Sequence, residues 1–304
     1  MKVLFIHTAN MGDVVSSMGV IRAAADKWGC VDVLIRPVFS GLLAGEPGIT
    51  EVIEEGVKQN DYDLIVDLDS SRVSRKLIKK LRGRRKIGRY VSLMRRIKYS
   101  GYYDAQVPKR PIDHIVKDYN VVGEAVGLKE ISRPSMVSVQ HDQEIVDLVS
   151  RIRGQGKDVS VLAPEASNPI RSLPIELVEG VIDRLRSQGT AVILVGLNEA
   201  LCRSWVEKYT GWVYWQPMKM LGLRTLFSSV KTFYGCDSGP MHLASAMGME
   251  VVALFGPTRP ANYGPPILSG RFIEKEFPCR PCNQNKPCPY DIRCFKSITA
   301  EDVL

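Results

Sequence analysis

The first residue able to do chemistry is an aspartate close to the N-terminus. Asp13 ends the segment 7–13 (HTANMGD), which follows the apolar run 3–6 and opens a helical pattern. A carboxylate there can act as a general base on a hydroxyl within hydrogen-bond reach, and Gly12 lets a ligand approach the backbone closely. Asp13 is equally suited to capping the helix, because aspartate is among the best N-caps. The segment lacks the Gly-x-Gly-x-x-Gly pattern, which argues against a dinucleotide site of the dehydrogenase type.

A second segment, 236–244 (CDSGPMHLA), combines the features of an anion site. Pro240 suits the first turn of a helix, where its missing N–H has no partner to lose. Free N–H groups at a helix N-terminus bind phosphate or diphosphate. His242, one turn further, is either a second contact to that anion or a structural histidine, and Asp237 orients the loop N–H groups or contacts another part of a nucleotide. The predicted anion site comprises Ser238, Gly239, Pro240, Met241 and His242.

Two further loops that follow apolar runs carry charged candidates. Arg171 lies in the loop 163–174, where its guanidinium could neutralise a leaving diphosphate through two parallel hydrogen bonds; a surface arginine is the alternative. Glu199 follows the apolar run 191–195 and could accept hydrogen bonds from ribose hydroxyls. The plainer interpretation of that loop is that Asn198 caps the next helix.

Four of the seven cysteines fall within 16 residues. Cys279 and Cys282 form a Cys-x-x-Cys pair, the usual half of a zinc knuckle, but Cys288 and Cys294 lack the spacing of the second half. Disulfides are not expected in a reducing cytosol. The sequence therefore leaves three states open: a structural zinc, free or partly oxidised thiols, and redox chemistry. No catalytic metal is expected, because the four histidines show no ligand spacing.

Positive charge is concentrated in one stretch. Residues 72–110 contain 15 Lys or Arg and one acid, Asp104, so this stretch carries +14 and the rest of a chain of net charge +8 carries −6. Such a block predicts a polyanionic partner: nucleic acid, an anionic lipid surface or a phosphorylated ligand. A solvated helix face is the alternative. Nucleic acid is disfavoured, because the stretch offers only four tyrosines for stacking and no known binding motif.

These candidates must be positioned by alternating strands and helices. A chain of 304 residues with 45% apolar residues has room for two domains. Continuous apolar runs predict buried parallel strands at 3–6, 31–35, 63–67, 159–163, 191–195 and 251–255. Helical spacing predicts helices at 14–28, in the basic stretch from 71, and at 112–126, 175–187, 223–229 and 241–247. The segment 131–142 breaks this rhythm. The fold class is therefore α/β, with Rossmann-like domains at 1–140 and 141–304 and the ligand in the cleft between them.

Neither a spanning helix nor a signal peptide is predicted. Mean hydropathy is −0.06, and no uninterrupted apolar run reaches the roughly 18 residues that a spanning helix needs. The N-terminus lacks the small-residue cleavage site of a signal peptide. We therefore expect a cytoplasmic protein.

Taken in order, these segments resemble glycosyltransferase family 9, the ADP-heptose:lipopolysaccharide heptosyltransferases. The resemblance rests on 11–15 (MGDVV), 237–244 (DSGPMHLA), 254–260 (LFGPTRP) and the tail 294–299 (CFKSIT). It spans almost the whole chain, and the second and third segments together are its specific part. The family implies a GT-B fold, in which the first domain mainly binds the acceptor and the second binds the nucleotide sugar.

The resemblance also implies an inverting transfer that needs no cofactor. Asp13 is then the general base that takes the acceptor's proton, and Arg171 and the helix N-terminus at 238–242 stabilise the charge of the departing ADP. The further donor contacts that it implies are Gly12, the acids Asp237 and Glu199 and, in the adenine pocket, Met218.

The leading hypothesis is heptosyl transfer from ADP-heptose to the inner core of lipopolysaccharide, on Kdo or heptose carried by lipid A. The alternatives are a family member that moves another nucleotide-activated sugar to a cell-surface glycan, and a sugar-nucleotide epimerase on the same scaffold. The basic stretch becomes the candidate contact to the lipid acceptor and to the anionic inner face of the inner membrane, where we expect a peripheral protein. The residues assigned to it are Arg72, Arg75, Arg82, Arg84, Arg85 and Lys86.

Overall fold

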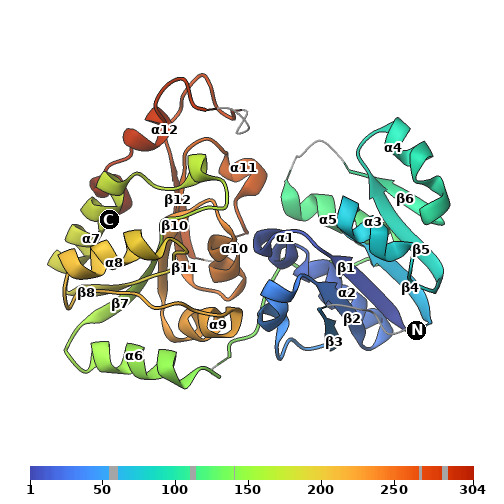
Figure 1. Cartoon of the computed structure of the whole chain (residues 1–304), viewed down its shortest axis with the longest axis horizontal. Coiled ribbons are helices and arrows are strands. Elements are labelled where there is room, and N and C mark those ends of the chain that lie inside the picture. Colours follow the sequence, from blue (N-terminus) through green and yellow to red (C-terminus); the bar gives the residue numbers. More distant parts are fainter. Residues whose placement is uncertain (55–60, 110–113, 140, 267–268, 283–286) are drawn as a thin grey trace. The chain divides into compact units, whose positions relative to one another are not determined.

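The computed structural model describes residues 1–304 except 55–60, 110–113, 140, 267–268 and 283–286. The chain forms two compact units, Met1–Val137 and Ser138–Leu304. The division falls in the segment 131–142, which contains Pro134. Figure 1 shows that each unit is built around its own sheet, with helices packed against it.

Unit 1 contains a six-stranded parallel sheet in the order β3-β2-β1-β4-β5-β6. Its strands are β1 (Val3–His7), β2 (Val31–Ile35), β3 (Ile49–Ile53), β4 (Tyr62–Asp67), β5 (Gly83–Tyr90) and β6 (Ala105–Pro108). The three central strands β1, β2 and β4 are the apolar runs that the sequence predicts, and they are almost entirely buried. The other three are less apolar and owe their structure to pairing with these neighbours.

In the described part of unit 1 the helices are α1 (Met11–Ser16), α2 (Met18–Trp28), α3 (Arg72–Ile78), α4 (Leu93–Lys98) and α5 (Ile115–Ala125), with 3-10 turns at Pro37–Leu43 and Ser100–Tyr102. The single helix predicted at 14–28 is therefore two helices. Ser17 separates them, and its hydroxyl donates to the Val14 carbonyl at 2.8 Å. Such serine bonds compete with the backbone bonds of a helix.

The prediction that the basic stretch from residue 71 is helical is wrong over its middle part. Residues 83–90 form β5, which pairs with β4 on one side and β6 on the other. A Cβ added at Gly88 would lie 2.3 Å from the Tyr103 ring, so ring and strand pack together only because this position has no side chain. A strand also sends successive side chains to opposite faces, which divides the basic residues between two surfaces.

Unit 2 has a second six-stranded parallel sheet, in the order β12-β11-β10-β7-β8-β9. Its strands are β7 (Asp158–Ala163), β8 (Thr190–Leu194), β9 (Val213–Tyr214), β10 (Thr232–Cys236), β11 (Glu250–Phe255) and β12 (Ser269–Glu274). Its helices are α6 (Gln143–Arg153), α7 (Ile175–Ser187), α8 (Glu199–Lys208), α9 (Met220–Ser229), α10 (Gly239–Ala246), α11 (Pro260–Tyr263), α12 (Arg293–Lys296) and α13 (Ala300–Val303), with a 3-10 turn at Pro169–Arg171. Its buried core includes Leu162, Val178, Ile182, Trp205 and Phe295.

Each sheet has a switch point beside its first strand. β1 lies between β2 and β4, and β7 lies between β8 and β10. In each unit the chain therefore adds strands on one side of the first strand and then crosses to add the others on the opposite side. Ligands of parallel α/β sheets bind at such points, outside the carboxyl ends of the strands. The topology therefore directs attention to the loops after β1 and β4 and to those after β7 and β10. The predicted α/β class with two Rossmann-like units is confirmed.

Candidate active site

Asp13 lies at the switch point of unit 1, in the first turn of α1 just after Gly12. The N-cap of α1 is Asn10 and Asp13 is the third helical residue, so the capping interpretation of Asp13 is wrong. Its carboxylate is partly exposed and accepts a hydrogen bond from the Tyr119 hydroxyl, with Oη 3.2 Å from Oδ1. Tyr119 comes from α5, 106 residues along the chain. A carboxylate that is held in place and still accessible meets the geometric needs of a general base.

Buried polar groups surround Tyr119. Its ring centre lies 5.4 Å from that of His7 and 5.3 Å from the Arg89 guanidinium. Arg89 is 2% exposed and forms an ion pair with Asp118, so it does not belong to the basic surface. Burial raises the pKa of Tyr119 well above its ordinary value, and the charge of Asp13 adds to the shift. Burial lowers the pKa of His7. Tyr119 therefore stays protonated as a donor, and His7 stays neutral at neutral pH.

Two further aspartates end or follow β4. Asp69 accepts hydrogen bonds from the Thr8 N–H at 3.0 Å and from the Thr8 hydroxyl at 2.7 Å. Asp67 is fully buried, and burial, reinforced by the charge of Asp69, raises its pKa to about 8. Asp67 is thus protonated at neutral pH. Neither Asp67 nor Asp69 is predicted as a site residue, although an Asp-x-Asp at the end of an apolar run is a visible signal.

The segment 236–244 of unit 2 has the predicted strand-to-helix geometry. β10 ends at Cys236, and α10 follows with Ser238 as its N-cap and Pro240 in the first turn. The Ser238 hydroxyl donates to the Cys236 carbonyl at 3.1 Å and makes no cap bond. The first N–H groups of α10 therefore lack a side-chain cap and lie at the positive end of the helix. Met241 is a correction, because its fully buried side chain belongs to the core and leaves no surface for a ligand.

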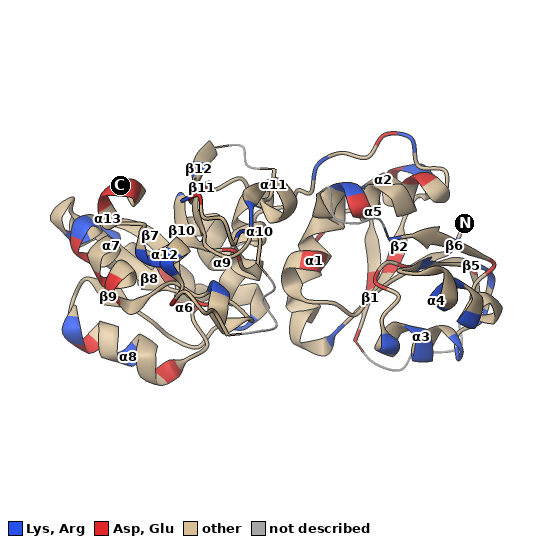
Figure 2. Ribbon diagram, turned by 90° about the horizontal axis from the view of Figure 1, so that it is seen from above, with Lys and Arg blue, Asp and Glu red and all other residues tan. Residues whose placement is uncertain are grey.

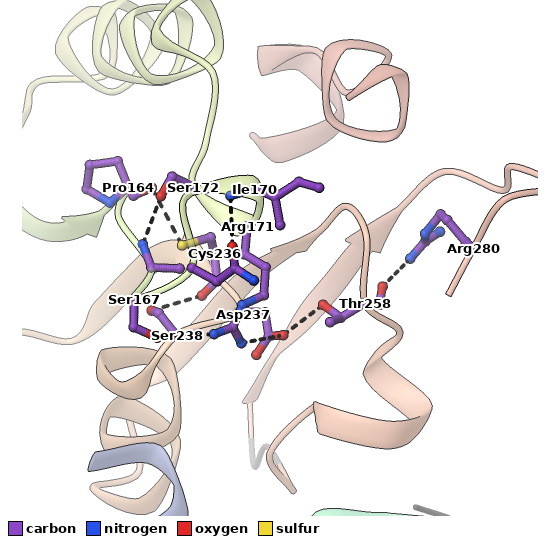
Figure 3. A network of polar contacts seen from close by, with 12 residues as sticks. Pro164, Ser167, Ile170, Arg171, Ser172, Cys236, Asp237, Ser238, Thr258 and Arg280 are labelled. Atoms are coloured by element: carbon purple, nitrogen blue, oxygen red, sulfur yellow. Dashed lines mark hydrogen bonds and ion pairs between the residues drawn. The ribbon is translucent and has the colours of Figure 1, made fainter. Parts of the chain in front are cut away.

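Arg171 and Asp237 meet at the switch point of unit 2 (Figure 3). Arg171 Nη1 lies 3.3 Å from Asp237 Oδ2, and Nη2 lies 3.2 Å from the Ser167 hydroxyl. Asp237 is almost fully buried and also accepts from the Thr258 hydroxyl at 2.7 Å. A guanidinium held by a carboxylate thus stands next to the start of α10, and both groups suit the oxygens of a diphosphate.

This contact changes the interpretation of Asp237. The sequence predicts Arg171 and Asp237 as site residues but not their contact, and it assigns Asp237 to orienting loop N–H groups or to contacting a nucleotide. In the structure Asp237 orients the Arg171 guanidinium. Thr258 was not predicted as a site residue. Its signal was its place in the segment 254–260, whose sequence LFGPTRP carries the family resemblance.

In the loop after β8, the structure supports the simpler interpretation, in which Asn198 caps the next helix. The Asn198 side chain accepts from the Leu201 N–H at 3.1 Å, which confirms that it caps α8. Glu199 is exposed in the first turn of α8 and pairs with Arg203 at 2.7 Å. Glu165, which was not predicted, accepts from the Asn198 N–H at 3.1 Å and so ties this loop to the one after β7.

The adenine-pocket candidate, Met218, lies half-buried in the segment between β9 and α9. The backbone carbonyl of Gly196, in the loop after β8, accepts from the Trp215 ring nitrogen at 3.1 Å. The segment that carries Met218 is thereby anchored to the carboxyl edge of the sheet.

Most, but not all, of the assigned basic residues are exposed. Figure 2 shows Lys and Arg on α3 and α4. Two residues are corrections. Arg75 is 8% exposed, with its guanidinium 4.2 Å from the Tyr99 ring centre. Lys86 Nζ donates to the carbonyl of Ile78, the last residue of α3, at 3.1 Å and to that of Leu81 at 2.7 Å. Arg110 lies outside the described residues. The exposed members are Arg72, Arg82, Arg84 and Arg85.

The four clustered cysteines influence one another electrostatically. Burial raises the pKa of the Cys282 thiol, and Cys279 and Cys288 raise it further. Burial likewise raises the pKa of Cys294, with Cys288 and Cys279 contributing. No disulfide joins any of the seven cysteines. Over the part of the chain that the structure describes, no three His, Cys, Asp or Glu side chains form a group arranged to hold a metal ion.

Comparison with known families supplies the decisive observation. The family model described as glycosyltransferase family 9 (heptosyltransferase) matches residues 52–291, which is most of the chain. The chain belongs to glycosyltransferase family 9. One curated relative, lipooligosaccharide heptosyltransferase 2 of Campylobacter jejuni, is 36% identical over 70 residues. That alignment covers 22% of this family 9 chain and 22% of the relative, so the match spans about a fifth of the relative's length.

Solved structures extend the likeness to the whole fold. E. coli ADP-heptose lipopolysaccharide heptosyltransferase II has a TM-score of 0.79 at 18% identity, covering 100% of this chain and 96% of that one. E. coli heptosyltransferase WaaC with ADP has a TM-score of 0.71 at 17% identity, and the match covers 99% of this chain and 100% of that one. The GT-B fold expected from the resemblance is therefore confirmed for this family 9 chain.

Proposed function

We propose that this family 9 chain is an inverting glycosyltransferase that transfers heptose from ADP-heptose to the inner core of a lipopolysaccharide. One observation carries the proposal: the Arg171–Asp237 pair stands at the switch point of unit 2, beside the N-terminus of α10. Guanidinium and helix N–H groups both bind diphosphate oxygens, which suits a nucleotide-diphosphate sugar. Membership of a family described as heptosyltransferases supports heptose as the sugar.

In this proposal unit 1 supplies the base and unit 2 holds the leaving group. The Asp13 carboxylate takes the proton of an acceptor hydroxyl while that oxygen bonds to the anomeric carbon of heptose. The bond from this carbon to the ADP oxygen breaks, and ADP leaves with its electron pair. Arg171 and the N–H groups of α10 stabilise the ADP charge, so the chemistry requires no metal ion. Attack opposite the leaving group inverts the anomeric carbon.

Release of ADP by the purified protein, with ADP-heptose and Kdo-lipid A as substrates, tests this function. We expect release that requires both substrates, needs no added divalent cation and yields the inverted anomer. Absence of turnover would refute heptosyl transfer. Turnover with a different nucleotide sugar would mean another donor, and conversion of the donor without acceptor would indicate an epimerase.

Replacing Tyr119 with Phe is expected to lower kcat about tenfold and to leave KM values nearly unchanged. The variant keeps the ring contacts but loses the 3.2 Å bond to Asp13, and a hydrogen bond to a charged group is worth ~1.5–3 kcal/mol. Steady-state kinetics measure the effect. In an Asp13→Asn background the same change should lower kcat no further, because its effect depends on the carboxylate.

Tyr62→Phe is the matched control for Tyr119→Phe. Tyr62 is another buried tyrosine of unit 1 whose hydroxyl donates to an aspartate, Asp32 Oδ2, at 2.9 Å. Its loss should change stability but not kcat. Equal losses of kcat in Tyr62→Phe and Tyr119→Phe would make the role of Tyr119 merely structural.

We also propose a structural zinc ion held by Cys279, Cys282, Cys288 and Cys294. The donor set fits, because four thiolates are a common ligand set for structural zinc, and Cys279 and Cys288 lie close enough to raise the pKa of both Cys282 and Cys294. Their described side chains do not already form a metal group, so binding requires their rearrangement. Metal analysis of protein purified under reducing conditions should find about one zinc per chain, and Cys282→Ser should abolish it and lower Tm. Metal-free protein with four titratable thiols would contradict the proposal.

The place of action that we propose is the cytoplasmic face of the inner membrane, as a peripheral protein. No helix in the described ranges of the chain is long and apolar enough to span a bilayer. The exposed arginines of α3 and β5 support attachment to anionic lipid, since each basic residue near such a surface contributes up to about 1 kcal/mol.

A further inference from the structure

Helix α4 of unit 1 contains no buried residue. Leu93, Met94 and Ile97 are 65%, 81% and 67% exposed. Their spacing of i, i+1 and i+4 places them on one side of the helix, within about 100°. The remaining residues are Arg95, Arg96 and Lys98, and all three are exposed. Apolar side chains of this size exposed together mark an interaction site rather than ordinary surface.

Aromatic and basic residues border this helix. Tyr99, which ends α4, lies under the Arg75 guanidinium of α3, 4.2 Å from its ring centre. Lys79, the residue that follows α3, lies 4.6 Å from the ring centre of Tyr102, in the 3-10 turn after α4. These contacts place α3 beside the C-terminal end of α4, and both helices carry basic residues (Figure 2). The result is an apolar stripe edged by cations and tyrosines.

We propose that α4 inserts Leu93, Met94 and Ile97 into the headgroup region of an anionic bilayer, while its basic residues bind lipid phosphates. The idea rests on the proposed function, because a lipid-linked acceptor brings the enzyme to a membrane. Short amphipathic helices with basic and apolar faces bind membranes in this way, and tyrosines favour the interfacial level.

Charge identifies the occupant of this surface. Of the 14 Lys or Arg in the described residues 72–109, eleven are exposed, against one exposed acid, Asp104; Arg75 and Arg89 are buried and Lys86 is half-buried. An anionic lipid surface complements such a field over its whole area. A second copy of the same face is disfavoured, because two surfaces of equal positive charge repel. Burial of Leu93, Met94 and Ile97 then adds a hydrophobic contribution to binding, which salt does not screen.

Co-sedimentation with lipid vesicles tests the insertion. Wild type should bind vesicles of phosphatidylcholine mixed with phosphatidylglycerol and bind pure phosphatidylcholine weakly. The triple variant Leu93→Gln, Met94→Gln, Ile97→Gln should bind the mixed vesicles at least 100-fold more weakly, since each large apolar side chain removed from lipid is worth about tenfold or more. Val38→Gln is the matched control, because Val38 is 58% exposed in unit 1 but outside this helix. It should bind like wild type.

Fluorescence of a Met94→Trp variant gives a second measurement of insertion. Its emission should shift to the blue on vesicle addition and should be quenched by lipids brominated in the upper acyl chain. Wild-type binding by the triple variant, or no spectral change of the tryptophan, would overturn insertion and leave attachment by charge alone.

A water-soluble Kdo acceptor without acyl chains separates this proposal from the proposed function. The triple variant should release ADP normally with that acceptor and slowly with acceptor embedded in vesicles. If wild type binds vesicles through α4 but turns over neither acceptor, heptosyl transfer fails and insertion stands. If the triple variant matches wild type on both acceptors and on vesicles, insertion fails and heptosyl transfer stands.

Discussion

Replacing Asp13 with Asn is expected to lower kcat by roughly 10²–10⁴-fold while donor affinity changes little. The amide keeps the size of the carboxylate and still accepts the bond that Tyr119 donates at 3.2 Å. It cannot take a proton from the acceptor hydroxyl, so only the chemical step suffers. Steady-state ADP release gives kcat, and calorimetry with ADP gives the nucleotide affinity.

Asp26→Asn is the control for this substitution. Asp26 is exposed on α2 of the same unit, so it should have wild-type kinetics. Near-normal turnover by Asp13→Asn would mean that another group removes the proton. Because Asn10 holds the N-cap position, the role of Asp13 would then be structural, through its hydrogen bond with Tyr119 and a favourable interaction with the helix dipole.

Replacing Arg171 with Ala is expected to weaken ADP binding and slow transfer together, lowering kcat/KM by about 100-fold or more. Removing one fixed donor from a developing negative charge typically lowers the rate by roughly 10²–10³-fold. The Arg171 side chain is 21% exposed and that of Asp237 only 3%, so the variant also leaves a buried carboxylate without its cation. Such a charge is destabilising, and Tm should fall. Kinetics, ADP calorimetry and thermal melting measure the three effects.

The double variant Arg171→Ala, Asp237→Asn separates binding from stability. It removes the buried charge, so Tm should recover while ADP affinity stays low. Arg186→Ala is the surface control, because Arg186 pairs with Asp183 on the exposed face of α7. ADP binding by Arg171→Ala equal to wild type would make the Arg171–Asp237 pair structural and place the diphosphate elsewhere.

The sequence by itself determined those features that local pattern encodes. The strands β1, β2, β4, β7, β8 and β11 are mostly apolar and almost entirely buried, and a run buried on both faces carries its own signal. The starts of α8 and α10 are likewise local, since Asn198 and the Ser-Gly-Pro of 238–240 mark helix N-termini. The strand β5 carries no such signal, because its basic residues acquire strand structure from β4 and β6.

Only the tertiary structure decided which polar groups meet. Tyr119 and Asp13 are 106 residues apart, and Arg171 and Asp237 are 66 apart. The first pair forms because α5 packs against α1, and the second because parallel strands carry the loops after β7 and β10 to one switch point. A sequence shows that a residue is charged but not where its partner lies, so Arg89 was counted with surface cations although its ion pair with Asp118 is buried. Whether a side chain is buried, and which partner it meets, depends on residues that the topology brings together from distant parts of the chain. The local sequence around one residue does not carry that information.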